Sequence, residues 1–109
     1  MSARSRKLAE LNDRLRQTGQ GGRIVITRGI RERGETFVAR VLERVRTFDA
    51  FTKENDPYGE HDFGNFELDG ETIYFKVDYY NKTLDGGSEN PADPDQTTRV
   101  LTIMLAEEY

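Results

Sequence analysis

The clearest pattern of hydrophobic and polar positions in this chain runs from residue 59 to residue 81 and predicts a β-hairpin. Two stretches in which apolar and polar residues alternate flank Asp69-Gly70. This pair is typical of a two-residue turn, because both turn positions need positive φ. A turn at this pair fixes the register, so that Phe63 is expected to face Lys76 and His61 to face Asp78.

Alternation of side chains divides the hairpin into two faces with different character. One face is apolar and is expected to form the core, with Phe66, Leu68, Ile73, Phe75, Val77 and Tyr79. The other face combines aromatic rings with titratable groups: His61, Phe63, Tyr74, Lys76, Asp78 and Tyr80. This second face is read in three ways: as a protein-binding surface, as a stacking platform for single-stranded nucleic acid, or as further core beneath the first helix.

Three more elements precede the hairpin. Leu8, Leu11 and Leu15 recur at helical spacing and predict a first helix over residues 4–18. The β-branched stretch 23–30 predicts a strand with a bend near its end at Gly29, and an apolar stripe over residues 35–51 predicts a helix that packs on the sheet. A loop over 52–60 then leads into the hairpin.

The residues after the hairpin are read as an acidic loop followed by a last strand. Residues 82–96 contain two glycines and two prolines, and a loop of this length is typically functional or mobile. The β-branched residues of 97–109 favour a strand buried on both faces, while a helix that begins near Asp93 is the alternative. The order α-β-α-β-β-β predicts an α+β fold with a small, mostly antiparallel sheet, forming a single domain over residues 1–109.

Charge is distributed unevenly along the chain. The net charge is −4, but arginine dominates the first 47 residues and acidic residues dominate the remainder. Folding of the basic half against the acidic half would compensate these charges. The alternative is nucleic-acid binding through Arg40, Arg44 and Arg46, because arginine suits bidentate contacts with phosphate.

Composition narrows the classes of function. The chain contains no cysteine, which excludes disulfides, thiolate nucleophiles and zinc–sulfur sites. Its first residues lack the apolar core of a signal peptide, and no apolar run is long enough for a membrane span. A cytoplasmic protein without a membrane partner is therefore expected.

Three stretches carry a resemblance to a known family: NDPYGEHDFG at 55–64, FKVDYY at 75–80, and the ending ADP…TTRVLTIMLAEEY. Together they resemble a family of small bacterial proteins catalogued as domain of unknown function 3768, from Leu8 to Tyr109. The resemblance implies no catalytic residues, since the family is functionally uncharacterised. Its association with plasmids and other mobile elements implies a role against host defence, such as inhibition of a restriction or CRISPR complex.

His61 is the single histidine and the main candidate for chemistry. A His–Asp pair with Asp78 could act in general-base catalysis, or it could be a structural cross-strand pair. A metal site is a further reading, with ligands drawn from Asp56, Glu60, His61, Asp62 and Asp78.

These patterns favour a binding protein without a cofactor over an enzyme. The expected mode of action is contact between the acidic half and a basic protein surface. The candidate binding residues are those of the second hairpin face and the acidic loop: Phe63, Tyr74, Lys76, Tyr80, Asp85, Glu89, Asp93 and Asp95. A small enzyme or metal-dependent protein that uses His61 and Asp78 is the alternative, and a bare edge strand or aromatic face would favour a homodimer.

Overall fold

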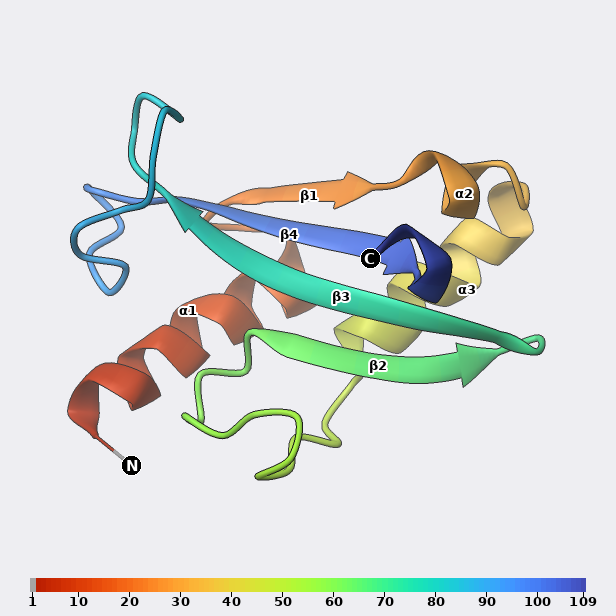
Figure 1. Cartoon of the computed structure of the whole chain (residues 1–109), viewed down its shortest axis with the longest axis horizontal. Coiled ribbons are helices and arrows are strands. Elements are labelled where there is room, and N and C mark those ends of the chain that lie inside the picture. The colour runs from red at the N-terminus through yellow and green to blue at the C-terminus, as the bar shows by residue number, and fades with distance from the viewer. Residues whose placement is uncertain (1) are drawn as a thin grey trace.

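A computed structural model describes residues 2–109 and places one mixed sheet at the centre of the molecule (Figure 1). Within this range the elements are α1 (Ala3–Thr18), β1 (Arg23–Ile26), α2 (Arg28–Arg31), α3 (Glu35–Arg46), β2 (Phe63–Leu68), β3 (Glu71–Tyr80), β4 (Thr98–Leu105) and the 3-10 helix η1 (Ala106–Glu108). The strand order is β1-β4-β3-β2. β1 runs parallel to β4 and the other two pairings are antiparallel, which confirms the α+β class.

The central hairpin has the register that its turn predicts. Phe63 pairs with Lys76, and Phe66 pairs with Ile73. The turn residues Asp69 and Gly70 have φ of 52° and 79°, the positive values that a hairpin turn of this kind requires. Strong local turn chemistry therefore fixes the pairing of β2 with β3.

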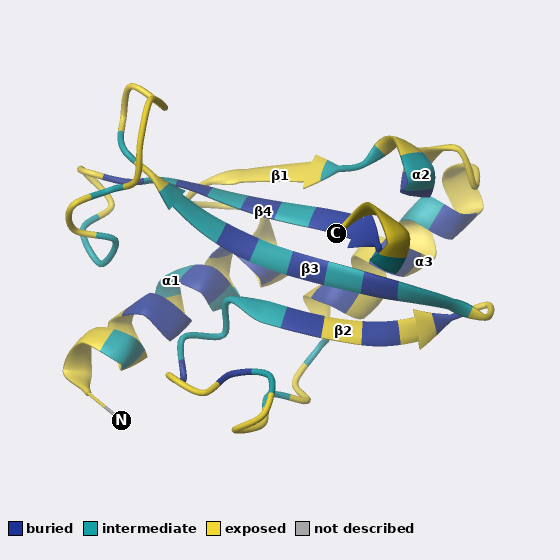
Figure 2. Ribbon diagram, in the orientation of Figure 1, coloured by how far each residue is buried: buried dark blue, intermediate teal, exposed yellow. Residues whose placement is uncertain are grey.

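The two faces of the sheet differ in what covers them. α3 lies behind the sheet in Figure 1, and its apolar stripe packs on the inner face together with Leu15 of α1. Buried and more exposed residues alternate along β2 and β3 (Figure 2). The core contains the inward-facing residues of all three antiparallel strands: Phe66, Leu68, Ile73, Phe75, Val77, Leu101, Ile103 and Leu105.

The last strand, β4, lies in the middle of the sheet between β1 and β3. This placement confirms the prediction of a strand over 97–109 and rules out the helical alternative. β4 is buried on both faces only near its C-terminal end, where Met104 on the outer face is 3% exposed. Val100 and Thr102 on the same face are half-buried.

Strand β1 is shorter than predicted. It ends at Ile26, and residues 28–31 form the single-turn helix α2 after Thr27, which has an extended backbone. The backbone N–H of Gly29 donates to the carboxylate of Glu108 at 2.9 Å and is not available to a strand ladder. The predicted strand over 23–30 was therefore wrong in its second half.

Helix α3 also ends earlier than the predicted residue 51. The cause is a long-range contact with Arg16, whose guanidinium donates to the carbonyl oxygens of Val45, Arg46 and Phe48 at 2.9, 3.2 and 2.8 Å. The carbonyls of Val45 and Arg46 belong to the last turn of the helix, where carbonyls lack the usual intrahelical partners, and Phe48 lies just beyond it. The side chain from α1 satisfies all three, although Val45 also accepts from the N–H of Phe48 at 3.4 Å. Phe48 still reaches the core, with its ring centroid 5.1 Å from that of Phe75.

Helix α1 matches its predicted range closely. Ser2 caps its start by accepting from the N–H of Ser5 at 3.0 Å, and Gly19 ends it with φ of 78°. The buried side chains of α1 include Asn12 and Arg16 besides Leu8 and Leu15. Polar groups therefore contribute to the attachment of α1 to the sheet.

Candidate functional site

The outer face of the sheet is the surface that the hairpin pattern marks as a candidate site. We use "outer sheet face" for the side chains that β2, β3 and β4 direct away from α1 and α3, together with Tyr109: Phe63, Tyr74, Lys76, Asp78, Tyr80, Thr102, Met104 and Tyr109. Among residues 2–109, the element that lies over this face is the short η1 with the chain end that follows it (Figure 1). The reading in which the first helix covers these aromatic rings was therefore wrong.

Three aromatic rings form a cluster at one side of the outer sheet face. The ring of Tyr109 meets those of Tyr74 and Phe63 nearly at right angles, with centroid distances of 5.3 and 6.0 Å. Phe63 and Tyr74 lie 5.5 Å apart. Tyr109 remains 71% exposed, so the cluster presents an aromatic surface to solvent.

Glu108 holds this end of the chain in place. Its carboxylate accepts from the hydroxyl of Thr27 at 2.6 Å and from the N–H groups of Gly29 and Leu105, each at 2.9 Å. Burial alone would raise the pKa of Glu108, but these hydrogen bonds outweigh it and lower the pKa. One carboxylate thus fixes η1 and directs Tyr109 over β2 and β3.

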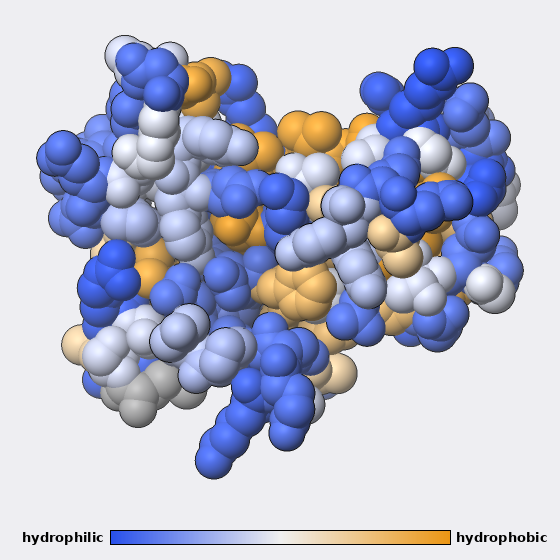
Figure 3. All heavy atoms as spheres, viewed as in Figure 1, coloured by the Kyte–Doolittle hydropathy of each residue, from blue (hydrophilic) through white to orange (hydrophobic). Residues whose placement is uncertain are grey.

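A hollow of about 350 Å³ lies beside the aromatic cluster, above the centre of β3 and β4. Lys76 and Asp78 line it and form an ion pair at 2.9 Å, and this hydrogen bond is the main reason that the pKa of Lys76 is raised. Tyr80, which is 38% exposed, also lines the hollow. Figure 3, viewed onto this face, shows hydrophobic atoms interspersed with hydrophilic ones. Aromatic residues are enriched at protein-binding sites, and this face carries four of them.

The acidic loop 82–96 continues from the end of β3 and is held by its own side chains. Asp85 accepts from Thr83 at 2.7 Å and from Asn81 at 2.8 Å, and these hydrogen bonds lower its pKa. The backbone N–H of Asp95 donates to Asp93 at 2.9 Å and lowers the pKa of that carboxyl group in the same way. Asp85 and Asp93 therefore shape the loop, and its mobility stays a prediction.

Glu89 and Asp95 are the two other acidic residues of the loop, and both are exposed. Within the described residues, neither side chain forms a hydrogen bond or an ion pair. Their carboxylates are directed to solvent and can meet a partner without loss of loop structure. They are accordingly the loop residues best suited to intermolecular contact.

The predicted pairing of His61 with Asp78 was wrong. β2 begins at Phe63, and His61 precedes it with φ of 56°. The Nδ1 atom of His61 lies 3.0 Å from the carboxylate of Asp13 in α1, and its ring stacks on Phe51 with centroids 4.1 Å apart. Asp78 points to the outer face, so these two residues cannot form a catalytic pair.

Of the other predicted metal ligands, Asp56 lies near His61, with its carboxylate 3.8 Å from Nε2, whereas Asp78 lies on the outer face of the sheet. Asp56 accepts from the backbone N–H groups of Glu60 and His61, at 2.9 and 3.2 Å, and so shapes the loop before β2. Burial raises the pKa of Asp62, and the nearby carboxylate of Glu60 raises it further. Across residues 2–109, no three His, Cys, Asp or Glu side chains come together in an arrangement that could hold a metal ion.

A buried polar cluster joins α1 to the sheet, and sequence reasoning missed it. Asn12 donates from Nδ2 to the hydroxyl of Tyr79 at 2.9 Å and to the carbonyl of Glu60 at 3.0 Å. Its Oδ1 accepts from Nε of Arg99 at 2.8 Å, and both side chains are almost fully buried. Burial lowers the pKa of Arg99, whereas it raises that of Tyr79, so the phenol stays neutral. The sequence did contain a signal for this cluster: Asn12 and Arg99 are polar residues at positions where the apolar patterns of the first helix and the last strand predict the core.

Two of the three arginines proposed to bind nucleic acid are paired within the chain. Arg40 lies 2.6 Å from the carboxylate of Asp69 at the hairpin turn, and Arg46 pairs with Glu43 in the preceding turn of α3. Arg40 and Arg33, which pairs with Glu71 at 2.5 Å, place part of the basic half against the acidic half, whereas the Arg46–Glu43 pair lies within the basic half. Intramolecular charge compensation therefore occurs here.

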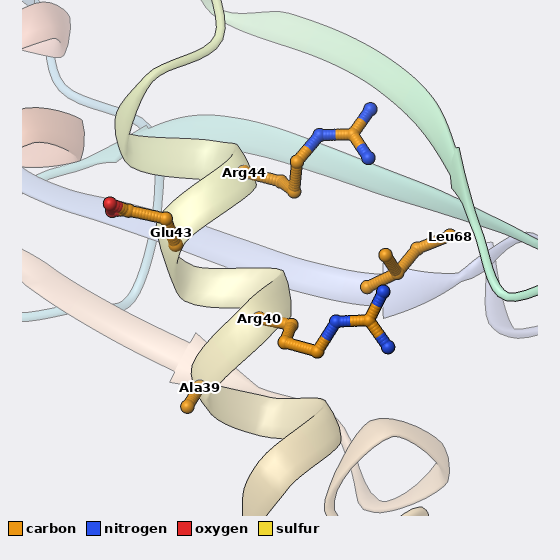
Figure 4. A pocket seen from close by; sticks show the side chains of 5 residues that line it. All are labelled: Ala39, Arg40, Glu43, Arg44 and Leu68. Atoms are coloured by element: carbon orange, nitrogen blue, oxygen red, sulfur yellow. The ribbon is translucent and has the colours of Figure 1, made fainter.

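Arg44 differs from these two because its partners are not carboxylates. Its guanidinium donates to the backbone carbonyl of Glu67 at 3.2 Å and lies 4.7 Å from the centre of the Phe66 ring. Arg40 and Arg44 project toward the same side of α3, near Leu68 of β2 (Figure 4). In the part of the chain that the structure describes, Arg44 thus has no anionic partner.

Comparison with known proteins places the chain in a family without giving a function. No curated protein and no solved structure matches the chain. Among residues 2–109, none of the helices has the length and apolar character needed to span a bilayer. The model of the family described as "Protein of unknown function (DUF3768)" matches residues 26–108, which cover most of the chain and include the outer sheet face except Tyr109. The chain therefore belongs to this family, as the three sequence stretches predicted.

Proposed function

We propose that this protein acts by binding a protein partner through the outer sheet face and the adjoining acidic loop. The observation that carries the proposal is a sheet face over which, in residues 2–109, the short η1 and the chain end lie in place of a long helix. On it the aromatic cluster and Tyr80 lie on either side of the Lys76–Asp78 ion pair. Exposed rings that are held in one orientation lose little entropy on binding, and Tyr is enriched at interface hot spots. The mode of action is binding, without a catalytic step or a cofactor.

Charge indicates the chemistry of this partner. Loop 82–96 contains four acidic residues and a single lysine, Lys82. Glu89 and Asp95 direct their carboxylates to solvent at the end of the sheet where Tyr80 lies. A basic protein surface would complement the loop, and the aromatic residues would supply apolar contact.

The finer proposal is that this partner belongs to a host defence complex and that binding inhibits it. It rests on the expectation, taken from the sequence resemblance, that the family is associated with mobile elements. A cytoplasmic location is part of the same proposal. Self-association through the outer sheet face is the competing use of the same surface.

Affinity capture with matched variants tests the proposal. The tagged full chain is used to capture proteins from nuclease-treated host lysate, next to Tyr80→Ala and the double variant Glu89→Lys/Asp95→Lys. The control is Asp49→Lys/Glu54→Lys, which makes the same change of charge at exposed positions of the loop between α3 and β2.

We expect one protein to be retained by the wild type and by the control, and to be lost from both other variants. Equal loss from the control would show that net charge alone determines capture. Retention by all variants would mean that the contact lies elsewhere. Either result would contradict the proposed surface.

A further inference from the structure

A second exposed apolar surface lies on the opposite side of the molecule, on the solvent side of α3. Three hollows meet there at Ala39, with volumes of about 340, 470 and 430 Å³. We call this surface the α3 groove; its apolar residues are Ile24, Val38, Ala39, Leu42 and Leu68. Unlike the outer sheet face, it is built mainly on one helix.

The spacing of apolar residues along α3 determines which side of the helix carries the groove. Phe37, Val41 and Val45 form the buried stripe of this helix. Val38, Ala39 and Leu42 form a second apolar stripe, which begins one residue later. Ala39 and Leu42 are exposed, and Val38 is half-buried against the core. The small side chain of Ala39 at the centre leaves room for close approach by another element.

The edge strand β1 extends this apolar surface beyond α3. Ile24 lines the same hollow as Leu42, and the two side chains are 38% and 36% exposed. Among the described residues, β1 pairs with β4 alone and is an edge of the sheet. Edge strands of monomeric proteins are usually protected by charges or by a covering element, so exposed Ile24 indicates a covering partner.

Arginines surround the apolar residues of the α3 groove and indicate the charge of that partner. Arg31, Arg40, Arg44 and Arg46 line the hollows, against Glu35 and Glu43. Within residues 2–109, Arg31 and Arg44 have no carboxylate partner. Arg40 and Arg44 are one helical turn apart, and because Asp69 already pairs with Arg40, Arg44 is the charge of this pair that an anion of the partner would meet. Figure 4 shows both side chains on the same side of the helix.

We propose that the α3 groove binds an acidic amphipathic helix of a partner protein. The apolar residues of this helix would cover Leu42 and Ile24, and its carboxylates would meet Arg31 and Arg44 on the two sides of the groove. A second copy of this chain fits less well, because a symmetric contact would bring the arginines of both copies together. Nucleic acid fits less well because the groove is apolar and because Arg40 and Arg46 are already paired.

This inference is independent of the proposed function. It concerns the other side of the molecule and an acidic partner, whereas the proposed function concerns a basic one. The test is a titration of the isotope-labelled full chain, followed by backbone amide chemical shifts. The first probe is a peptide of about 15 residues with Leu at i, i+3, i+4 and i+7 and Glu at the flanking positions. The second is a peptide of the same composition with scrambled order, and the third is a single-stranded DNA of about 12 nucleotides.

Ala39→Lys distinguishes docking from simple charge attraction. The lysine fills the point where the hollows meet while adding positive charge, and lysine is a good helix former. Ala50→Lys, at an exposed loop position, is the control with the same added charge. Circular dichroism of both variants verifies that the fold is retained.

We expect the patterned peptide to shift resonances of α3 and β1 and to bind at least about tenfold more tightly than the scrambled peptide. Ala39→Lys should weaken this binding by about tenfold, whereas Ala50→Lys should leave it equal or stronger. The proposal would be overturned by equal binding of the two peptides, by unchanged binding to Ala39→Lys, by larger shifts of the same resonances with DNA, or by no binding at millimolar peptide.

Discussion

Replacement of Asn12 by alanine is predicted to destabilise the protein strongly, because this side chain forms three hydrogen bonds: two connect α1 to the sheet and one connects it to the loop before β2. Each hydrogen bond contributes roughly 1 kcal/mol net to stability. The variant also leaves Nε of the buried Arg99 without its acceptor, and a buried charged donor without a partner costs more than a neutral one. We therefore expect the free energy of unfolding to fall by about 3–5 kcal/mol.

A loss of this size is a large part of the roughly 5–15 kcal/mol that stabilises a typical domain. Urea unfolding measures it directly, and the midpoint should fall by about 2 M for a domain of this size. Glu10→Ala, at an exposed position of the same helix, is the control and should stay within about 0.5 kcal/mol of the wild type.

A double-mutant cycle separates the polar contact from the packing of α1. Asn12→Leu combined with Arg99→Met removes both members of the buried pair and leaves apolar side chains of similar size. This double variant should be at least about 1 kcal/mol more stable than the sum of the two single changes predicts. Additive effects, or an Asn12→Ala variant as stable as Glu10→Ala, would refute the structural role of the cluster.

Three further predictions concern individual contacts. Gly64→Ala should lower the free energy of unfolding by about 1–3 kcal/mol in urea titrations, because the added methyl group would lie 2.5 Å from the ring of Phe75; an unchanged midpoint would contradict this packing. The pKa of Glu108 is lowered in the folded chain, so its contribution to stability is present above the unfolded-state pKa and should be lost as pH falls through the folded-state pKa; Glu108→Gln should remove this acid dependence, and identical pH profiles would disagree with the contact. His61→Ala and Asp78→Ala should show additive effects on thermal stability, because the two side chains lie on different faces; a coupling above about 0.5 kcal/mol would restore the rejected pair.

The parts of the fold that could be predicted are those in which short-range chemistry determines the structure. The Asp69-Gly70 turn fixed the register of β2 with β3, since both residues take positive φ without large cost. Gly19 ended α1 in the same way, with φ of 78°. The division of the hairpin into an apolar and a mixed face followed directly from alternation.

The errors arose where distant residues determine local structure. The end of α3 depends on Arg16 from α1, and the end of β1 depends on Glu108 near the end of the chain. No pattern within residues 35–51 or 23–30 reveals these partners. His61 likewise leaves the hairpin register because Asp13 and Phe51 provide contacts outside the strand.

The candidate site was predictable in composition and not in its arrangement. Alternation identified Tyr74, Lys76 and Tyr80 as one face, but whether that face was covered depended on where α1 packs. The contribution of Tyr109 could not be foreseen, because it follows from the position of η1 over the sheet. The α3 groove was missed since its apolar stripe is adjacent to the core stripe and merges with it in the sequence.

Site-specific photo-crosslinking in host cells tests the binding surface most directly. A photoreactive phenylalanine analogue is introduced at Tyr80 on the outer sheet face and, in a separate variant, at Tyr58, which is 74% exposed in the loop between α3 and β2. We predict a crosslink to one host protein from position 80 and none from position 58. A crosslink of equal or greater yield from position 58, or none from position 80, would contradict the proposal that this protein acts through the outer face of its sheet.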